Sequence, residues 1–165
     1  MTTTTQLESM EVTVPQALLA QLERTTSNTA DLGPDMSAAF EALYAAVGKA
    51  GITPSGRPRA IYTAWGPNEV RFTVAVPIDR APTVVPDGIE VAAMPERVAL
   101  RFVHQGPYRE LRATYGRIEA WLRERGGIKT PEDWARYAPM WEEYMNDPTT
   151  TPESDLVTRI YLSIP

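Results

Sequence analysis

The chain has 165 residues, of which 43% are hydrophobic, and it carries a formal net charge of −5 with a pI of about 5.0. This composition predicts one folded domain and excludes a disordered chain, while the acidic balance argues against general nucleic-acid binding. Cysteine is absent, which excludes disulfides and thiolate catalysis. No apolar run is long enough for a membrane helix, and Met1–Glu8 lacks the features of a secretion signal, so we expect a cytoplasmic protein without membrane contact.

The first half of the chain predicts a strand, a helix and a hairpin, in that order. Residues 10–22 carry the apolar and β-branched pattern of a strand. A helix follows, because apolar residues recur at spacings of three and four, and Gly33-Pro34-Asp35 is interpreted as the turn and N-cap before it. Residues 59–65 and 70–76 predict a hairpin across Gly66-Pro67-Asn68. The helical stripe comprises Met36, Phe40, Leu43 and Val47, and it ends near Gly48 and Gly51.

The second half repeats this pattern. Residues 98–104 alternate as in a strand, and the helix after them ends at Gly126-Gly127. Two more strands are predicted at Met140–Met145 and Leu156–Ile164. The second helical stripe comprises Tyr108, Leu111, Tyr115, Ile118 and Leu122. A shift of 75 residues places Phe40 on Tyr115, Leu43 on Ile118 and Gly51 on Gly126, which indicates a duplication.

These elements predict a single α+β domain over residues 1–165. Two β-α-β-β repeats, at about 8–79 and 90–165, are joined by a linker at about 80–94 and related by pseudo-two-fold symmetry. We expect a curved antiparallel sheet with both main helices on one side. A ligand cleft is expected on the other side, where no helix covers the sheet.

The segment Met140–Met145 contains the strongest candidate site. In an extended strand, Met140, Glu142 and Tyr144 share one face, and Trp141 and Glu143 point the other way. A carboxylate beside a tyrosine ring and a thioether suits a flat, lipophilic cation. The alternative for Glu142 is an exposed strand carboxylate or the partner of a nearby arginine.

The other candidates are aromatic residues in or near the predicted strands. Trp134 and Tyr137 either cover the cleft or anchor their loop, and Trp141 suits the core as well as the cleft. Strand parity alone does not decide which side chains of the first hairpin face a ligand. Tyr108 is expected to pack its helix on the sheet, and the isolated His104 is interpreted as structural. No metal site or cofactor is expected. The hairpin candidates are Tyr62, Trp65 and Phe72.

Six segments carry a recognisable family pattern: His104–Leu111, Tyr115–Leu122, Glu142–Pro148 and Thr158–Pro165, with Ala60–Tyr62 and Phe72–Ile78 in the first half. Together they resemble the GyrI-like small-molecule-binding family, the effector-binding domain of bacterial transcription activators, in its stand-alone form. The resemblance implies a duplicated fold with an aromatic-walled cleft, in which a glutamate of a Glu-x-Tyr pattern meets cationic ligands. Glu142 and Tyr144 occupy that pattern here.

Three functions are compatible with this resemblance. The first is a multidrug-binding protein that takes up aromatic, lipophilic and preferably cationic small molecules. The second is a hydrolase of cyclopropane-containing cytotoxins, in which Glu142 and Tyr144 are the catalytic residues. The third is a protein that interacts with gyrase. The oligomeric state is left open, and a monomer is compatible with the sequence.

Overall fold

The secondary structure follows the predicted order, except that two strands precede each main helix where the sequence predicted one. The computed structural model describes residues 7–66 and 68–165. Residues 1–6, and Pro67 of the predicted hairpin turn, lie outside the described residues. The first half contains β1 (Ser9–Val14), β2 (Ala17–Thr26), η1 (Thr29–Asp31), α1 (Leu32–Lys49), β3 (Arg59–Trp65) and β4 (Val70–Pro77). The second contains β5 (Glu90–Met94), β6 (Arg97–Gln105), η2 (Tyr108–Glu110), α2 (Leu111–Glu124), η3 (Pro131–Tyr137), β7 (Met140–Tyr144), η4 (Glu153–Asp155) and β8 (Val157–Ser163).

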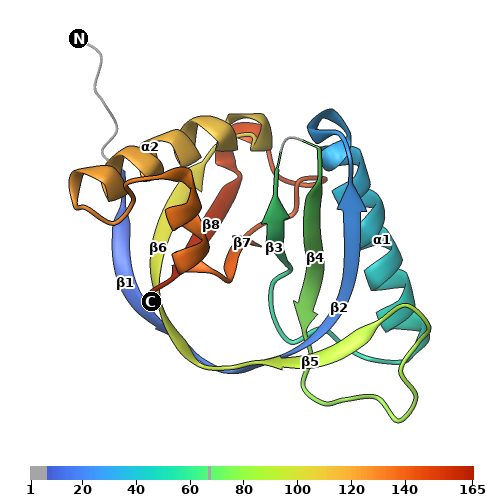
Figure 1. Cartoon of the computed structure of the whole chain (residues 1–165). Coiled ribbons are helices and arrows are strands. Elements are labelled where there is room, and N and C mark those ends of the chain that lie inside the picture. Colours follow the sequence, from blue (N-terminus) through green and yellow to red (C-terminus); the bar gives the residue numbers. More distant parts are fainter. Residues whose placement is uncertain (1–6, 67) are drawn as a thin grey trace.

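All eight strands form one antiparallel sheet in the order β1-β6-β8-β7-β3-β4-β2-β5. The order is symmetric about the central β7–β3 pair, since β8, β6 and β1 on one side correspond to β4, β2 and β5 on the other. Each half also contributes its first strand to the edge of the other half: β1 pairs with β6, and β5 pairs with β2. The sheet curls strongly (Figure 1), which confirms the predicted curvature. The segment predicted as a linker therefore includes β5.

The helix ends show where local sequence rules hold and where they fail. α1 begins at Leu32, so Gly33, Pro34 and Asp35 lie in its first turn and do not form the predicted cap. Proline is tolerated there because the first N–H groups of a helix have no intrahelical partner. Beyond the two helices, Gly51 and Gly126 both have a φ of 72°, a conformation that favours glycine.

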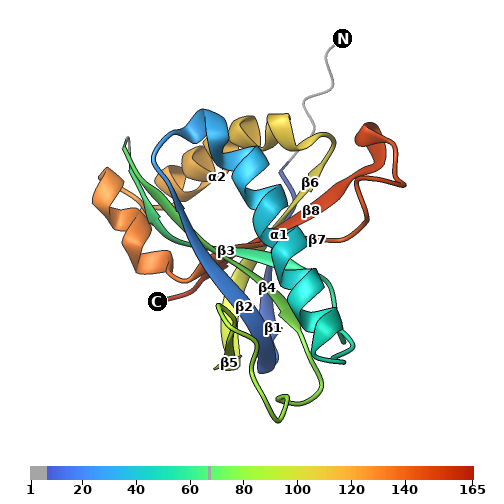
Figure 2. The same cartoon turned by 90° about the vertical axis from the view of Figure 1, so that its right-hand side faces the viewer.

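Both main helices cover the same face of the sheet. α1 packs on β2 and β4, and α2 packs on β6 and β8, and the strand register places all these contacts on one side (Figure 2). The core under α1 includes Leu43, Val47, Phe72 and Val74; the core under α2 includes Ile118, Leu122, Phe102 and Ile160. Within the described residues, no helix is long and apolar enough to cross a membrane.

The opposite face forms a third cluster that draws on all eight strands. Its buried members come from β2, β3, β4, β6, β7 and β8, and partly buried residues of β1 and β5 pack against them. Because residues from both ends of the sheet meet in one cluster, this face lies inside the curl, and we call it the concave face. The buried members are Leu19, Ile61, Ala75, Ala99, Trp141 and Tyr161.

Removal of equivalent core side chains should destabilise both halves. Leu43 and Ile118 are each 0% exposed, so Leu43→Ala and Ile118→Ala should each lower the free energy of unfolding by about 2–5 kcal/mol. Urea denaturation measures this change. The exposed Glu41→Ala in α1 should stay within about 0.5 kcal/mol of wild type. A loss in only one of the two core variants would contradict the equivalence of the halves.

Candidate ligand-binding site

Glu142 lies at the centre of the helix-bearing face and is 3% exposed. Three tyrosine hydroxyls donate hydrogen bonds to its carboxylate. The Tyr144 hydroxyl lies 2.7 Å from Oε1, the Tyr62 hydroxyl 3.3 Å from Oε1, and the Tyr115 hydroxyl 2.6 Å from Oε2. We call these four residues the Glu142 cluster. It joins β7, β3 and α2, and therefore links the two halves of the chain.

The strand register explains how the cluster forms. Alternation along β7 places Glu142 and Tyr144 on one face, and Ala60 of β3 lies directly beside Glu142. The small alanine side chain leaves space above it, into which Tyr62 extends from two residues along the strand. Tyr115 reaches the same carboxylate from the first turns of α2.

Burial dominates the electrostatics of the cluster. It raises the pKa of Glu142 above the ordinary value of 4.5, and the hydrogen bonds from Tyr115, Tyr144 and Tyr62 oppose this shift. Burial and the Glu142 charge raise the tyrosine pKa values well above 10.0, so the hydroxyls remain donors. In the described part of the chain, no lysine or arginine forms an ion pair with Glu142. The site can therefore accept a positive charge from a ligand.

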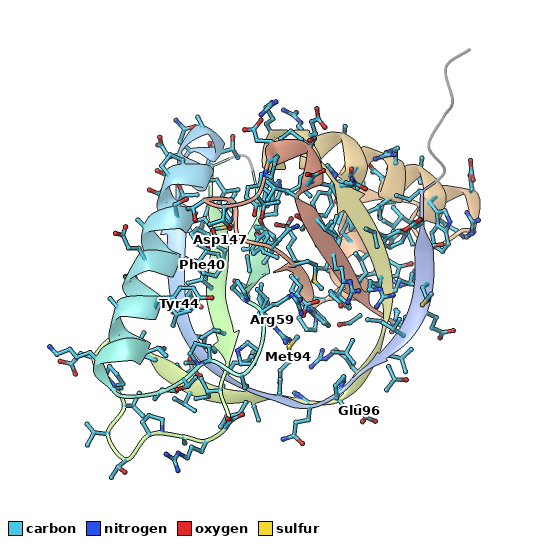
Figure 3. The ribbon with its side chains drawn as sticks, turned by 180° about the vertical axis from the view of Figure 1, so that it is seen from behind. Phe40, Tyr44, Arg59, Met94, Glu96 and Asp147 are labelled. Carbon is cyan, nitrogen blue, oxygen red and sulfur yellow. The ribbon has the colours of Figure 1, made fainter. Side chains whose placement is uncertain are left out.

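Partly buried aromatic side chains surround the cluster between α1 and α2. Phe40 of α1 contacts the Tyr144 ring edge-on, with centroids 5.8 Å apart, and Tyr108 contacts it at 5.5 Å. The Tyr144 hydroxyl also lies 3.4 Å from the Met36 sulfur. We call this set, with the Glu142 cluster, the aromatic seam. Figure 3 shows Phe40 and Tyr44 extending from α1 toward the segment that carries Asp147.

The Glu142 carboxylate is almost inaccessible to solvent in this structure. Two surface depressions, of about 270 and 430 Å³, lie elsewhere, the first beside Arg24 and Asp35 and the second beside Ser55 and Pro77. Tyrosine rings cover the carboxylate. A ligand can reach Glu142 only if these half-buried side chains move apart.

The structure brings together part of the predicted site. Glu142, Tyr144, Tyr62 and Tyr108 meet in the seam, and Met140 shares their face beside Tyr62. Trp65 contacts the Tyr62 ring at 5.6 Å but is 64% exposed. All of these lie on the face that carries the helices, whereas the sequence analysis placed the cleft on the opposite face.

Four other predicted residues do not belong to the Glu142 cluster, although Phe72 is the cross-strand neighbour of Tyr62. Trp141 lies on the concave face and stacks on Tyr161 at 4.8 Å. Phe72 is fully buried under α1. Trp134 and Tyr137 of η3 pack against the core under α2, and the Tyr137 hydroxyl donates to the Gly127 carbonyl at 2.9 Å. These two residues therefore anchor their loop, the second alternative in the sequence analysis. His104 is buried and hydrogen-bonded to Thr114 and Pro107, which agrees with a structural role.

The sequence analysis missed Tyr115, Phe40 and Met36 as site residues because it assigned them to the buried stripes of the helices. A usable signal was present. A tyrosine hydroxyl within an apolar stripe needs a hydrogen-bond partner, and Tyr115 finds Glu142. Phe40 is the position that the 75-residue shift pairs with Tyr115, and both face the central strands.

Comparison with known proteins agrees with this fold. The model of the GyrI-like small molecule binding domain matches residues 7–165, so the chain belongs to the GyrI-like family. A search of curated proteins found no match.

Several solved structures share the fold. The EcmrR C-terminal domain has a TM-score of 0.76 and 15% identity, over 95% of this chain and 96% of that one. SAV2435 bound to tetraphenylphosphonium has a TM-score of 0.66 and 13% identity, over 96% and 94%. A hydrolase from Listeria innocua has a TM-score of 0.59 and 13% identity, over 94% and 90%.

Glu142 should make stability depend on pH. Because its pKa is raised in the folded state, the folded chain binds this proton more tightly than the unfolded chain does. This contribution to the free energy of unfolding is fully present below pH 4.5, and it is lost as the pH rises through the raised pKa of Glu142. Relative to Glu142→Gln, the wild type should therefore lose stability across this window, as measured by urea denaturation at a series of pH values. A difference that is independent of pH would contradict the burial of an ionisable Glu142.

Proposed function

We propose that this protein binds lipophilic aromatic cations in the aromatic seam, with Glu142 as the group that recognises positive charge. The observation that supports this function is a buried carboxylate with three tyrosine donors and no cationic partner among the described residues. A desolvated carboxylate is costly without a counter-charge, and a bound cation provides one.

The side chains that line the aromatic seam are suited to bind ligands of different shapes. Tyrosine and phenylalanine rings attract cations through their π-faces, and Met36 adapts to ligand shape. Stacking and dispersion do not require fixed hydrogen-bond geometry, so ligands of different outline are compatible with one site. Because tyrosine rings cover Glu142, binding at this carboxylate includes a step in which the aromatic side chains move apart.

The comparisons agree with this proposal at the level of the family. The GyrI-like domain is a small-molecule-binding domain, and the SAV2435 neighbour holds tetraphenylphosphonium, a lipophilic cation. We propose the same ligand class here, and a cytoplasmic location for the protein. The acidic pI supports small molecules over nucleic acid as partners.

The charge dependence of binding tests the proposal. Tetraphenylphosphonium and neutral triphenylphosphine oxide present similar phenyl surfaces, and isothermal titration calorimetry measures both. Glu142→Gln should weaken tetraphenylphosphonium binding about tenfold or more, since it removes a desolvated counter-charge, and should leave the oxide within about threefold. Asp147→Asn, at an exposed acid beside the seam, is the matched control and should have the smaller effect. Equal losses for both ligands would remove the electrostatic part of the proposal.

A hydrolase is the second candidate, and the raised pKa of a carboxyl group beside tyrosine donors is the observation that favours it. In this reaction Glu142 takes a proton from water as the water oxygen attacks a ring carbon of a cyclopropane conjugated to a carbonyl group. The ring C–C bond breaks, its electron pair passes to the carbonyl oxygen, and Tyr144 donates a hydrogen bond to that oxygen. Protonation of the resulting enolate completes the addition of water.

Mass spectrometry tests the hydrolase directly. Incubation of a cyclopropane-containing electrophile with the protein should give a product heavier by one water, and Glu142→Gln should abolish it. Unchanged substrate at a stoichiometric amount of protein would reject the hydrolase and leave the binding function.

A further inference from the structure

A second group of charged side chains lies on the concave face, across the sheet from Glu142. Arg59 of β3 and Arg159 of β8 flank Glu143 of β7 in the strand register, and Arg101 of β6 lies beside Tyr161. Figure 3 shows Arg59 and Met94 together in the space that the curled sheet encloses. We call Arg59, Arg101 and Arg159 the arginine cluster. Two of these arginines flank Glu143 and the third lies on the next strand, so the group carries an excess of positive charge.

Arg59 is buried without an oxygen acceptor. The residue is 6% exposed. Among the described residues, its Nε has no hydrogen-bond partner and its Nη1 donates only to the Met94 sulfur, at 3.4 Å. The guanidinium carbon lies 6.0 Å from the centre of the Trp141 ring. A thioether is a weak acceptor, and a buried charge without a hydrogen-bonded counter-ion costs free energy. The guanidinium therefore has unused capacity for an anion.

Arg101 shows the same feature. Its Nε is buried without a partner, and Nη2 donates to the Met10 sulfur at 3.5 Å. Two arginines on one face of the sheet thus have methionine sulfur where carboxylate oxygen is the usual acceptor.

Glu143 does not satisfy Arg59. Its Oε1 accepts a hydrogen bond from the Tyr161 hydroxyl at 3.2 Å and lies 4.0 Å from Nη1 of Arg159. Within residues 7–66 and 68–165, no carboxylate forms an ion pair with Arg59. Burial lowers the pKa of Arg59, while the charges of Glu143 and Tyr161 oppose this effect. Arginine nevertheless keeps its charge in proteins, so the compensation has to come from another group.

We propose that the concave face contains an anion-binding site in which the Arg59 guanidinium takes the carboxylate or phosphate group of a small organic ligand. The planar fork of the guanidinium matches both groups and forms two parallel N–H···O bonds. Met94, at the end of β5, is half-buried and unbranched, so it can turn away as the anion enters. Arg159 and Arg101 raise the positive potential around the entering group.

This site is separate from the one that binds cations in the proposed function. Arg59 and Glu142 lie on the same pair of central strands, but their side chains extend from opposite faces of the sheet. Loss of one site therefore does not imply loss of the other.

Side-chain nuclear magnetic resonance of the full chain tests the anion site. With ¹⁵N-labelled arginine, the Arg59 Nε–H signal should shift saturably on addition of sodium benzoate or inorganic phosphate, and the two titrations distinguish a carboxylate ligand from a phosphate ligand. Neutral benzyl alcohol should not shift it. Arg59→Gln should weaken anion binding about tenfold or more, because charge-assisted hydrogen bonds are lost. This variant lacks the Arg59 signal, so isothermal titration calorimetry measures its anion affinity beside that of the wild type. Glu143→Gln should tighten it, since a neighbouring negative charge is removed.

Two variants serve as controls. Arg71→Gln alters an arginine on the adjacent strand β4 that is already paired with Glu69 at 3.1 Å, and it should leave binding within about twofold. Glu142→Gln should also bind the anions as wild type does. If Arg59→Gln does not fold, Arg59→Lys keeps the charge without the fork and should bind more weakly than wild type. The proposal is overturned if neither anion shifts the Arg59 signal saturably, or if an Arg59 variant that folds binds both anions with wild-type affinity.

Discussion

The Glu142 carboxylate is held by hydroxyl groups from three tyrosines, and this interaction joins the two halves of the chain at their common boundary. Tyr62 comes from the first half, and Tyr115 and Tyr144 come from the second. Hydrogen bonds from neutral donors stabilise a buried carboxylate but do not neutralise it. The fold therefore holds a carboxyl group in a buried aromatic environment, which is the feature on which the proposed recognition of a lipophilic cation rests.

The central β3–β7 pair gives the two faces of the sheet opposite electrostatic character. Ala60 and Glu142 form a cross-strand pair on the helix-bearing face, and the next pair, Arg59 and Glu143, lies on the concave face. Because successive side chains point to opposite faces, neighbouring residues contribute to separate sites. α1 packs on β2 and β4, and α2 packs on β6 and β8, so the aromatic seam lies over the central β3–β7 pair between the two helices. Because the chain is duplicated, the β3–β7 pair that joins the two halves lies at the centre of the sheet.

Much of the fold could be predicted from the sequence, because helix and strand periodicity reflects local geometry. The stripes that include Leu43 and Ile118 are buried as their spacing requires, and Gly51 and Gly126 lie in equivalent left-handed conformations beyond the two helices. The repeated element pattern and its 75-residue shift also predicted the duplicated α+β architecture. The predicted cap at Gly33-Pro34-Asp35 was wrong, since a first helical turn tolerates proline and the sequence alone did not fix where α1 begins. The exact repeat boundaries stay a prediction.

For the site, the sequence alone determined the residue types and their alternation along β7, so it placed Glu142 and Tyr144 on one face and Trp141 on the other. It did not determine which face carries the helices, because parity is relative and only the pairing of strands from both halves assigns the sides. The contacts of Tyr115 and Phe40 with the cluster, and the burial of Arg59 without an oxygen acceptor, likewise arise only in the tertiary structure. These features depend on the curl of the sheet and on helices packed across it, which bring together residues that are distant in the chain.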